Sequence, residues 1–158
     1  MTSAVTYRIR AATASDRDGI RSLLTASSLP TADLDSAPDL GFWVAEEFGQ
    51  LIATIGLERY GASGLLRSLV VSASRRRSGL GRELVATVEC AALKADIELL
   101  VLLTETAERF FMSLGYATVD RGYLPDDIKE SAEFRSLCPG SAVCMTKSLV
   151  SVSLRGTP

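Results

Sequence analysis

Apolar and polar side chains alternate along residues 5–11 (VTYRIRA), and this period of two predicts a strand with one buried face. The period then lengthens to that of a helix, because Ile20 and Leu24 lie four positions apart on one apolar stripe. Thr13 or Ser15 offers an N-cap for this helix, since either hydroxyl can accept a hydrogen bond from the first turn. The beginning of the chain therefore predicts a strand followed by an amphipathic helix.

The rest of the pattern predicts further strands and helices joined by short turns. The stripe of Leu80, Leu84 and Val88 predicts a long helix over residues 79–95, and the apolar run in residues 98–104 predicts a strand covered on both faces. The other expected elements are strands at 42–47, 51–60, 65–72, 116–120 and 142–147, a loop at 29–40, a turn at Gly49, and helices at 106–114 and 125–134. Strands that first follow one another and then alternate with helices indicate an α/β domain of the α+β kind, with a mixed central sheet.

The chain of 158 residues has the size of one ordinary domain, and its 47% apolar and 23% charged residues are typical of globular proteins. We therefore interpret residues 1–158 as a single domain. The formal net charge of −2 argues against a general nucleic-acid binder, which needs a basic surface. Arg8 and Arg10 interrupt the apolar N-terminal stretch, and no run reaches the roughly 18 apolar residues of a membrane span. Neither nucleic acid nor a membrane is expected as a partner.

The three cysteines, Cys90, Cys138 and Cys144, have no CxxC spacing, and the sequence contains no histidine. These features argue against a disulfide framework, a zinc site and a histidine-based triad, so we expect a cytoplasmic protein without a bound metal. Cys90 falls within the stripe of the long helix and is expected in the core. Cys138 and Cys144 could converge on arsenite, or they could simply pack as small apolar residues.

Residues 65–84 (LLRSLVVSASRRRSGLGREL) carry the strongest chemical signal. A strand leads into Arg75, Arg76 and Arg77, and then Gly79 and Gly81 open directly into the long helix. Glycines let a ligand approach the backbone, and a helix N-terminus offers unpaired N–H groups with a partial positive charge. Together with the arginines, these features predict a pyrophosphate cradle. The pattern is neither a Walker A loop nor GxGxxG, and the alternative is a surface loop with solvated arginines.

Two motifs resemble the GCN5-related N-acetyltransferase (GNAT) superfamily. Residues 76–81 (RRSGLG) are similar to its cofactor motif Arg/Gln-x-x-Gly-x-Gly/Ala, and residues 107–116 (AERFFMSLGY) are similar to its second motif Ala-x-x-Phe-Tyr-x-x-x-Gly-Phe/Tyr. The resemblance implies a mixed, mostly antiparallel central sheet with helices on both faces, and acetyl-CoA as the acetyl donor. It also implies that acetyl-CoA is bound by Leu69, Val70, Val71, Arg76, Arg77, Ser78, Gly79, Leu80, Gly81, Arg82, Thr104, Ala107, Phe110 and Phe111.

The family resemblance implies direct attack of a neutral amine on the thioester, which calls for a base because an ammonium must first lose a proton. Glu58 is our candidate and water is the alternative, while Glu58 could instead pair with Arg67 or face solvent. In the family the departing thiolate is often protonated by a tyrosine of the second motif, but Phe111 stands at that position here. Tyr60, Tyr123 or solvent could supply the proton instead, so we assign no general acid.

Arg67, Ser68 and Tyr60 are the candidate residues for binding the acceptor, because they lie on or beside the strand that leads to the arginines. Arg67 could bind the carboxylate of an amino-acid-like acceptor, together with Arg8 or Arg10. The alternative for each arginine is a position on the solvent side of its strand.

A narrower resemblance is to small acetyltransferases encoded beside arsenic-resistance genes, carried by segments 56–61 (GLERYG), 65–71 (LLRSLVV), 102–104 (LLT) and 134–145 (FRSLCPGSAVCM). It suggests an amino-acid-like arsenical or phosphinate, such as arsinothricin or phosphinothricin, as the acceptor. Three rival functions stay open: acetylation of a peptide or protein amine, a sensor that binds acetyl-CoA without turnover, and use of the fold only to pair with a partner. The C-terminal strand and residues 149–154 favour a homodimer.

Overall fold

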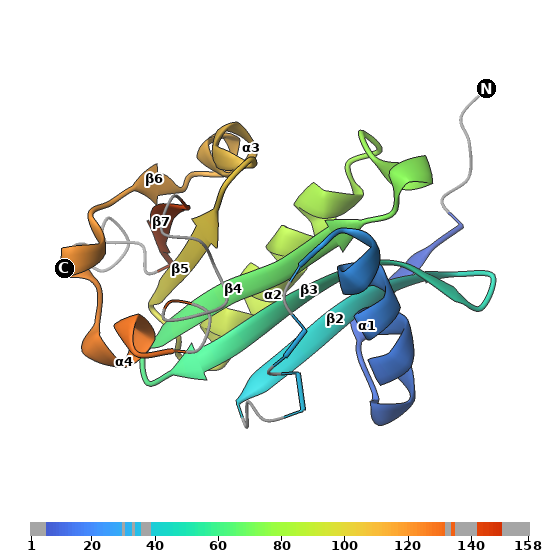
Figure 1. Cartoon of the computed structure of the whole chain (residues 1–158), viewed down its shortest axis with the longest axis horizontal. Coiled ribbons are helices and arrows are strands. Elements are labelled where there is room, and N and C mark those ends of the chain that lie inside the picture. The colour runs from blue at the N-terminus through green and yellow to red at the C-terminus, as the bar shows by residue number, and fades with distance from the viewer. Residues whose placement is uncertain are drawn as a thin grey trace, which may run out of the picture. The chain divides into compact units, whose positions relative to one another are not determined.

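The structure, a computed structural model, describes residues 6–29, 31–32, 34–35, 39–131, 134 and 142–149. The strands in these ranges are β1 (Arg8–Ala11), β2 (Leu40–Glu47), β3 (Gln50–Tyr60), β4 (Ser63–Val71), β5 (Leu99–Thr104), β6 (Ala117–Thr118) and β7 (Val143–Ser148). The helices are α1 (Arg17–Ala26), α2 (Leu80–Lys94), α3 (Glu108–Ser113) and α4 (Asp126–Lys129), with 3₁₀ turns at Ala14–Asp16, Ala73–Arg75 and Arg121–Tyr123 (Figure 1). Within the described part of the chain, no helix is long and apolar enough to cross a membrane.

The strands form one sheet in the order β1-β2-β3-β4-β5-β7-β6. β1 pairs with β2, and β7 pairs with both β5 and β6, in each case antiparallel. β4 and β5 run parallel, because α2 carries the chain from the end of one to the start of the other. The mixed, mostly antiparallel sheet that the sequence predicts is confirmed.

The chain divides into two compact units, residues 1–57 with 68–88 and residues 58–67 with 89–158. We call them the first and the second unit. The division falls within β3, β4 and α2, directly after Leu57, Arg67 and Val88. The arginine-rich loop therefore belongs to the first unit, and the second GNAT-like motif belongs to the second unit.

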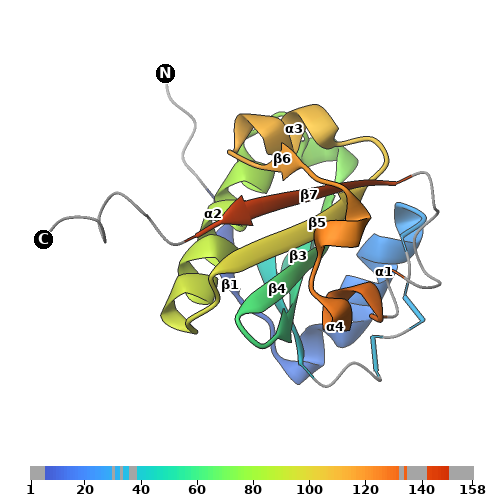
Figure 2. The same cartoon turned by 90° about the vertical axis from the view of Figure 1, so that its left-hand side faces the viewer.

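In the first unit, α1 and the beginning of α2 lie on opposite faces of the strands, as two views at right angles show (Figures 1 and 2). Ile20 and Leu24 of α1 form one core cluster with Val44 of β2 and Val70 of β4, and each of these side chains is at most 6% exposed. Burial of a side chain such as Leu24 stabilises the fold by roughly 1.5–3 kcal/mol. The predicted helix after the first strand is thus confirmed, with its apolar stripe on the sheet.

The stripe of α2 is also confirmed, since Leu80, Leu84 and Val88 are each at most 1% exposed. Cys90 is exposed, so the expectation that it lies in the core is wrong. The reason is helix geometry: two positions beyond Val88 correspond to about 200° around the helix, which is the opposite face.

In the second unit, β5 lies between β4 and β7, and Figure 2 shows β7 running along β5. Leu65 of β4, Val101 of β5 and Cys144 of β7 share a core cluster with Leu124 and Ile128. The segment from residue 124 to the end of α4 therefore covers one face of these strands.

The predicted helix over residues 125–134 is too long, because α4 ends at Lys129. Ile128 is fully buried, but Ser131 stands three positions later, where a continued helix would need another apolar side chain. The Ser131 hydroxyl instead accepts the Phe134 N–H at 3.4 Å. A serine that bonds the backbone in this way favours a turn over a helix interior.

Candidate active site

The arginine-rich loop of the first unit passes twice through left-handed backbone before α2 begins. Arg77 has a φ of 66° and Gly79 has a φ of 88°. Ser78 stabilises the turn, because its hydroxyl donates to the Arg75 carbonyl at 2.5 Å and accepts the Leu80 N–H at 3.4 Å. The loop is therefore held in shape by its own short polar side chain.

Gly79 is the point at which the loop leaves room for a ligand. Its carbonyl accepts the Glu83 N–H at 3.1 Å, so the helix ladder starts here, and the N–H groups of Gly81 and Arg82 have no acceptor within the helix. A Cβ added at Gly79 would meet no heavy atom within 4 Å. The positive φ explains why this position is glycine, and the open space lets an anion reach the helix N-terminus. These residues fit the predicted pyrophosphate cradle.

The three arginines of the loop occupy different environments. Arg75 pairs with Glu47, a buried carboxylate of β2 that also accepts a hydrogen bond from the Thr6 hydroxyl. Arg76 folds back, and its Nε donates to the carbonyl of the last residue of β4 at 3.2 Å. Arg77 is exposed. Arg75 therefore holds the loop to β2, while the Arg77 side chain is open to solvent.

The first turn of α2 contains the remaining predicted residues of this loop. Leu80 is 1% exposed, so its side chain belongs to the core and only its backbone faces the loop. Gly81 is half-buried and Arg82 is exposed. Glu83 on the same turn accepts a hydrogen bond from the Tyr7 hydroxyl, which ties the turn to the segment before β1.

The strand residues expected to bind the donor follow a backbone irregularity in β4. Ser68 has a φ of 60°, which is uncommon for a residue other than glycine and costs of the order of 1–3 kcal/mol. Val70 is buried beneath α1, whereas Leu69 and Val71 are half-buried. Sequence reasoning missed the irregularity, because serine has no marked preference for left-handed backbone.

The second motif lies in the second unit, where β5 leads into α3. The Ala107 N–H donates to the Thr104 hydroxyl at 2.9 Å, so Thr104 closes the turn before the helix. Phe111 is 6% exposed and packs edge-to-face against Phe110 and Tyr116, with ring centroids 5.0 and 5.4 Å apart. Phe111 is thus a core residue, and Phe110 is the half-buried aromatic of this motif.

Glu58, Tyr60 and Arg67 come together in the second unit. Arg67 Nη1 lies 3.4 Å from Glu58 Oε1, and the arginine side chain is wholly buried. Burial and a hydrogen bond to Glu58 raise the pKa of Tyr60 above its usual value, so the phenol keeps its proton. The alternative in which Glu58 pairs with Arg67 is confirmed, and the alternative in which Arg67 lies on the solvent side of its strand is wrong. Both strand residues face a covered side of the sheet.

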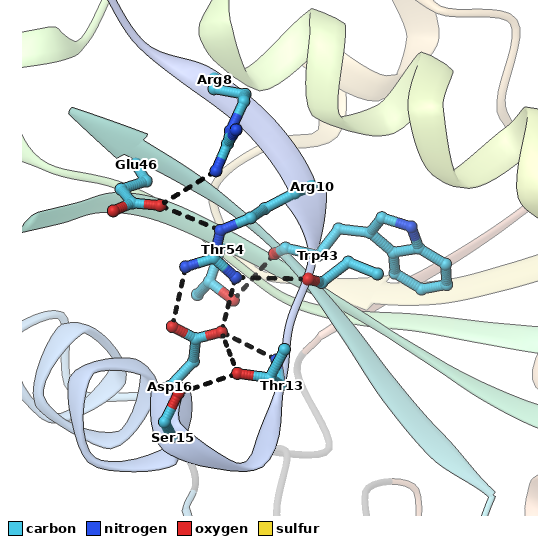
Figure 3. Close-up of polar contacts among 9 residues, drawn as sticks. Arg8, Arg10, Thr13, Ser15, Asp16, Trp43, Glu46 and Thr54 are labelled. Carbon is cyan, nitrogen blue, oxygen red and sulfur yellow. Dashed lines mark hydrogen bonds and ion pairs between the residues drawn. The ribbon is translucent and has the colours of Figure 1, made fainter. Parts of the chain in front are cut away.

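The N-terminal arginines of the first unit differ in what they can still bind. Arg10 donates to the two oxygens of Asp16 at 2.7 and 3.0 Å and to Glu46 at 3.0 Å (Figure 3). The Arg10 guanidinium holds the pKa of Asp16 well below its usual range, and Asp16 also accepts the Thr13 N–H at 2.8 Å. Arg8 lies 3.9 Å from Glu46 and is mostly exposed. Arg10 is therefore occupied, and Arg8 is the more available cation.

The tyrosines near the two motifs, which could protonate the departing thiolate, differ in burial and in hydrogen bonding. Tyr123 is 88% exposed. Tyr116 is buried, and its hydroxyl donates to Glu89 at 2.8 Å. Tyr60 is half-buried and bonded to Glu58, so it combines a retained proton with partial access.

Cys144 is buried in the core of the second unit, and this burial raises the pKa of its thiol to about 11. A thiol that stays protonated packs as a small apolar group and is a poor nucleophile. Cys138 lies outside the described residues, so the alternative in which Cys138 and Cys144 converge on arsenite is not tested.

Two hollows open on the first unit, apart from the arginine-rich loop. One of about 230 Å³ lies between the start of β2 and the turn before α1. The other, of about 590 Å³, runs between α1 and the β2–β3 hairpin and has Arg10 in its wall. Among the described residues that line these two hollows, Arg10 is the one predicted site residue, and its charge is already balanced there.

Comparison with known proteins gives a family and a fold. Residues 38–118 match the family model described as acetyltransferase (GNAT) domain. No curated protein matches the sequence. Among solved structures, a GNAT-family acetyltransferase from Staphylococcus aureus Mu50 is 16% identical, with a TM-score of 0.75 and coverage of 91% of this chain and 99% of that one.

Two further solved structures have known activities. N-acetylglutamate synthase from Neisseria gonorrhoeae, complexed with coenzyme A and N-acetyl-glutamate, is 19% identical with a TM-score of 0.78, and the match covers 94% of this chain and 36% of that one. The ribosomal-protein-S18-alanine N-acetyltransferase from Escherichia coli is 16% identical with a TM-score of 0.71, and the match covers 92% and 95%. At these identities the likeness shows the fold alone.

The match to the family model extends over more than half of the chain, and it contains both the arginine-rich loop and the second motif as far as Tyr116. The strand order and the mixed sheet agree with the fold of the solved structures. The chain is therefore an acetyltransferase that belongs to the GNAT family.

Proposed function

We propose that this chain is an acetyl-CoA-dependent N-acetyltransferase whose acceptor is a small, amino-acid-like amine, and that residues 1–158 work as one domain. The observation that carries the proposal is the cradle at Gly79, where left-handed backbone, open space and unpaired helix N–H groups occur together. Coenzyme A was bound in the solved synthase of the same fold, which supports the same donor here.

The residues of the cradle contact different parts of the donor in this proposal. Gly79, Gly81 and Arg82 offer backbone N–H groups to the pyrophosphate, while Arg77 adds an exposed positive charge. Arg76, Ser78 and Leu80 shape the loop. The backbone of Leu69, Val70 and Val71 binds the pantetheine arm. On the second motif Thr104, Ala107 and Phe110 complete the donor-binding set, and the buried Phe111 supports Phe110 from behind. The donor supplies an activated thioester.

Glu58 is the proposed base. Its side chain is 10% exposed, and its carboxylate is oriented by Arg67 and Tyr60. The chemistry requires the ammonium of the acceptor to lose a proton before its nitrogen can attack, and Glu58 accepts that proton. The C–N bond then forms as the C–S bond breaks, and the nitrogen releases its second proton to solvent. The thiolate takes a proton from solvent, or from Tyr60, which then regains one from solvent.

The acceptor class is the finer part of the proposal. Of the three residues predicted to bind the acceptor, the half-buried Ser68 and Tyr60 can contact it, whereas the wholly buried Arg67 acts through the Glu58 carboxylate with which it pairs. The resemblance to acetyltransferases of arsenic-resistance operons makes arsinothricin and phosphinothricin the first acceptors to test. Acetylation of a peptide amine is the second candidate, because one solved relative in fold acts on a ribosomal protein.

The first experiment is calorimetric titration of acetyl-CoA into the native protein and into Gly81→Trp. Micromolar binding by the native protein that is lost in the variant is the expected result, because an indole at position 81 fills the cradle. A Gly61→Trp variant, at the β3–β4 turn and away from the loop, is the control for general disturbance. No binding by the native protein would overturn the proposal.

Turnover is then measured as amine-dependent release of coenzyme A across a panel of amino acids, phosphinates, arsenicals and short peptides. A thiol reagent also labels Cys90, which is exposed, so the assay is run on Cys90→Ser. Release with small amines alone supports the proposal, and release with peptides alone supports the second candidate. Binding without release from any amine would identify a sensor. Gel filtration of the same sample tests the predicted homodimer.

A further inference from the structure

A half-buried polar network in the second unit links the end of α3 to α2 and β7. Lys147 of β7 lies 3.2 and 3.1 Å from the two carboxylate oxygens of Glu89 on α2. The Tyr116 hydroxyl donates to Glu89 at 2.8 Å, and the Lys147 ammonium also lies 5.5 Å from the centre of the Tyr116 ring. The carboxylate therefore binds two donors that come from different elements.

The same lysine also binds the C-terminal end of α3. Its Nζ donates to the Leu114 carbonyl at 2.8 Å. Because α3 ends at Ser113, no N–H group of the helix donates to this carbonyl. A cation at a helix C-terminus is also favoured by the helix dipole. Lys147 thus acts as a C-terminal cap supplied by a distant strand.

The space around the cap is tight, which fixes the geometry. Gly115 has a φ of 98°, and a Cβ added there would lie 3.3 Å from Cε of Lys147. The lysine side chain is 28% exposed and that of Glu89 is 18% exposed, so the pair is shielded from most of the solvent. A shielded pair with satisfied hydrogen bonds holds its partners more rigidly than a surface pair does.

We propose that Lys147 and Glu89 are positioning residues for the acetyl donor, and this inference rests on the proposed function. α3 has only six residues, so it needs external contacts to keep its place. It carries Phe110 and Phe111, and Phe111 packs directly on Tyr116, which the network holds. Fixing Tyr116 and the Leu114 carbonyl therefore fixes the helix that presents part of the donor-binding set.

The test is titration of acetyl-CoA into native protein, Lys147→Met and Lys129→Met at a temperature where all three are folded. Lys129 pairs with Asp126 at 3.4 Å on α4 of the same unit, so it is a matched lysine outside the network. We expect Lys147→Met to raise the Kd for acetyl-CoA by between about ten and a hundred times, as small displacements of binding groups can do. Lys129→Met should leave it unchanged.

Hydrogen exchange of the α3 amides distinguishes positioning from a general loss of stability. The expected result is faster exchange in α3 of Lys147→Met, with unchanged exchange in α1. If Lys147→Met fails to fold, Tyr116→Phe, which removes one hydrogen bond of the network, is used in its place for both measurements. An unchanged Kd in a folded variant would overturn the inference. If the native protein binds no acetyl-CoA, the proposed function fails. In that case, hydrogen exchange of α3 that is equal in Lys147→Met and in the native protein would overturn the inference on its own.

Discussion

Arg67 Nη1 lies 3.4 Å from Oε1 of Glu58, and the arginine side chain is wholly buried whereas Glu58 keeps a tenth of its surface in solvent. The buried guanidinium balances the charge of the carboxylate, and in our proposal the acceptor approaches the edge of the Glu58 side chain that stays in solvent. An ammonium that meets this edge finds a proton acceptor whose orientation is already set. Removal of Arg67 would leave the Glu58 carboxylate without this cation in a covered position.

Glu58→Gln should lower kcat by about a hundredfold, because general-base catalysis contributes factors of this size. The residual rate should rise with pH up to the pKa of the acceptor amine, since only the neutral amine then reacts. The measurement is a pH–rate profile of both proteins, with a thermal melt to confirm that the variant is folded. An unchanged kcat and profile would identify water as the base.

Gly79→Ala should weaken acetyl-CoA binding, because the added methyl group enters the cradle and the residue must keep a φ of 88°. Gly61→Ala is the matched control, since Gly61 has a φ of 63° and equally open surroundings at the β3–β4 turn. Both variants should lose about 1 kcal/mol of unfolding free energy from backbone strain. Only Gly79→Ala should change the Kd, and equal effects on Kd would contradict a cradle at this loop.

Two neighbouring arginines should give opposite results. Arg75→Ala should lower the unfolding free energy by about 3 kcal/mol, because it leaves the buried Glu47 without its cation. Arg77→Ala should leave stability unchanged and weaken acetyl-CoA binding by about fivefold, or roughly 1 kcal/mol. The second effect should fade as salt is raised, since an exposed charge is screened. Denaturant unfolding and calorimetry at two salt concentrations check both statements.

Asp16→Asn should destabilise the protein by about 2 kcal/mol at neutral pH, the size of hydrogen bonds to a charged group. Arg10 lowers the pKa of Asp16 in the folded protein, so the stabilisation is fully present above the unfolded-state pKa of about 3.9. It is lost as the pH falls below that value toward the folded-state pKa. The difference in urea unfolding free energy between the two proteins should therefore shrink as the pH falls from 7 toward 2. Asp35→Asn, which breaks an exposed pair with Arg17, should show a smaller difference.

The fold could be predicted wherever apolar residues recurred at the helical period over several turns. The stripe of Leu80, Leu84 and Val88 placed α2 within one residue of its observed ends. The helix beyond Pro125 was predicted too long, because the sequence pattern does not reveal that Ser131 bonds the backbone and turns the chain. Cys90 was misplaced because residues of a helix two positions apart face opposite sides.

The features of the candidate site that depend on residue type could be predicted from the sequence. Those that depend on how deeply a side chain is buried could not. Gly79 has the positive φ and open surroundings that a cradle needs, and glycine is itself the signal. Arg67 gave no sign of its burial, because Leu65 and Leu66 before it are also buried and the strand shows no alternation. The left-handed backbone of Ser68 likewise arises from the surroundings of β4, which a single sequence does not display.

Glu47 binds two partners that come from different parts of the chain, the Thr6 hydroxyl before β1 and the Arg75 guanidinium of the loop. A change at Glu47 would leave the Arg75 guanidinium without this carboxylate and the Thr6 hydroxyl without this acceptor, and a change at Arg75 would leave the buried Glu47 without its cation. Across relatives of this chain, residues 6, 47 and 75 should therefore change together, whereas residue 77 should vary on its own. Such joint variation would indicate that Glu47 is the residue that fixes the conformation of the arginine-rich loop in this chain and its relatives.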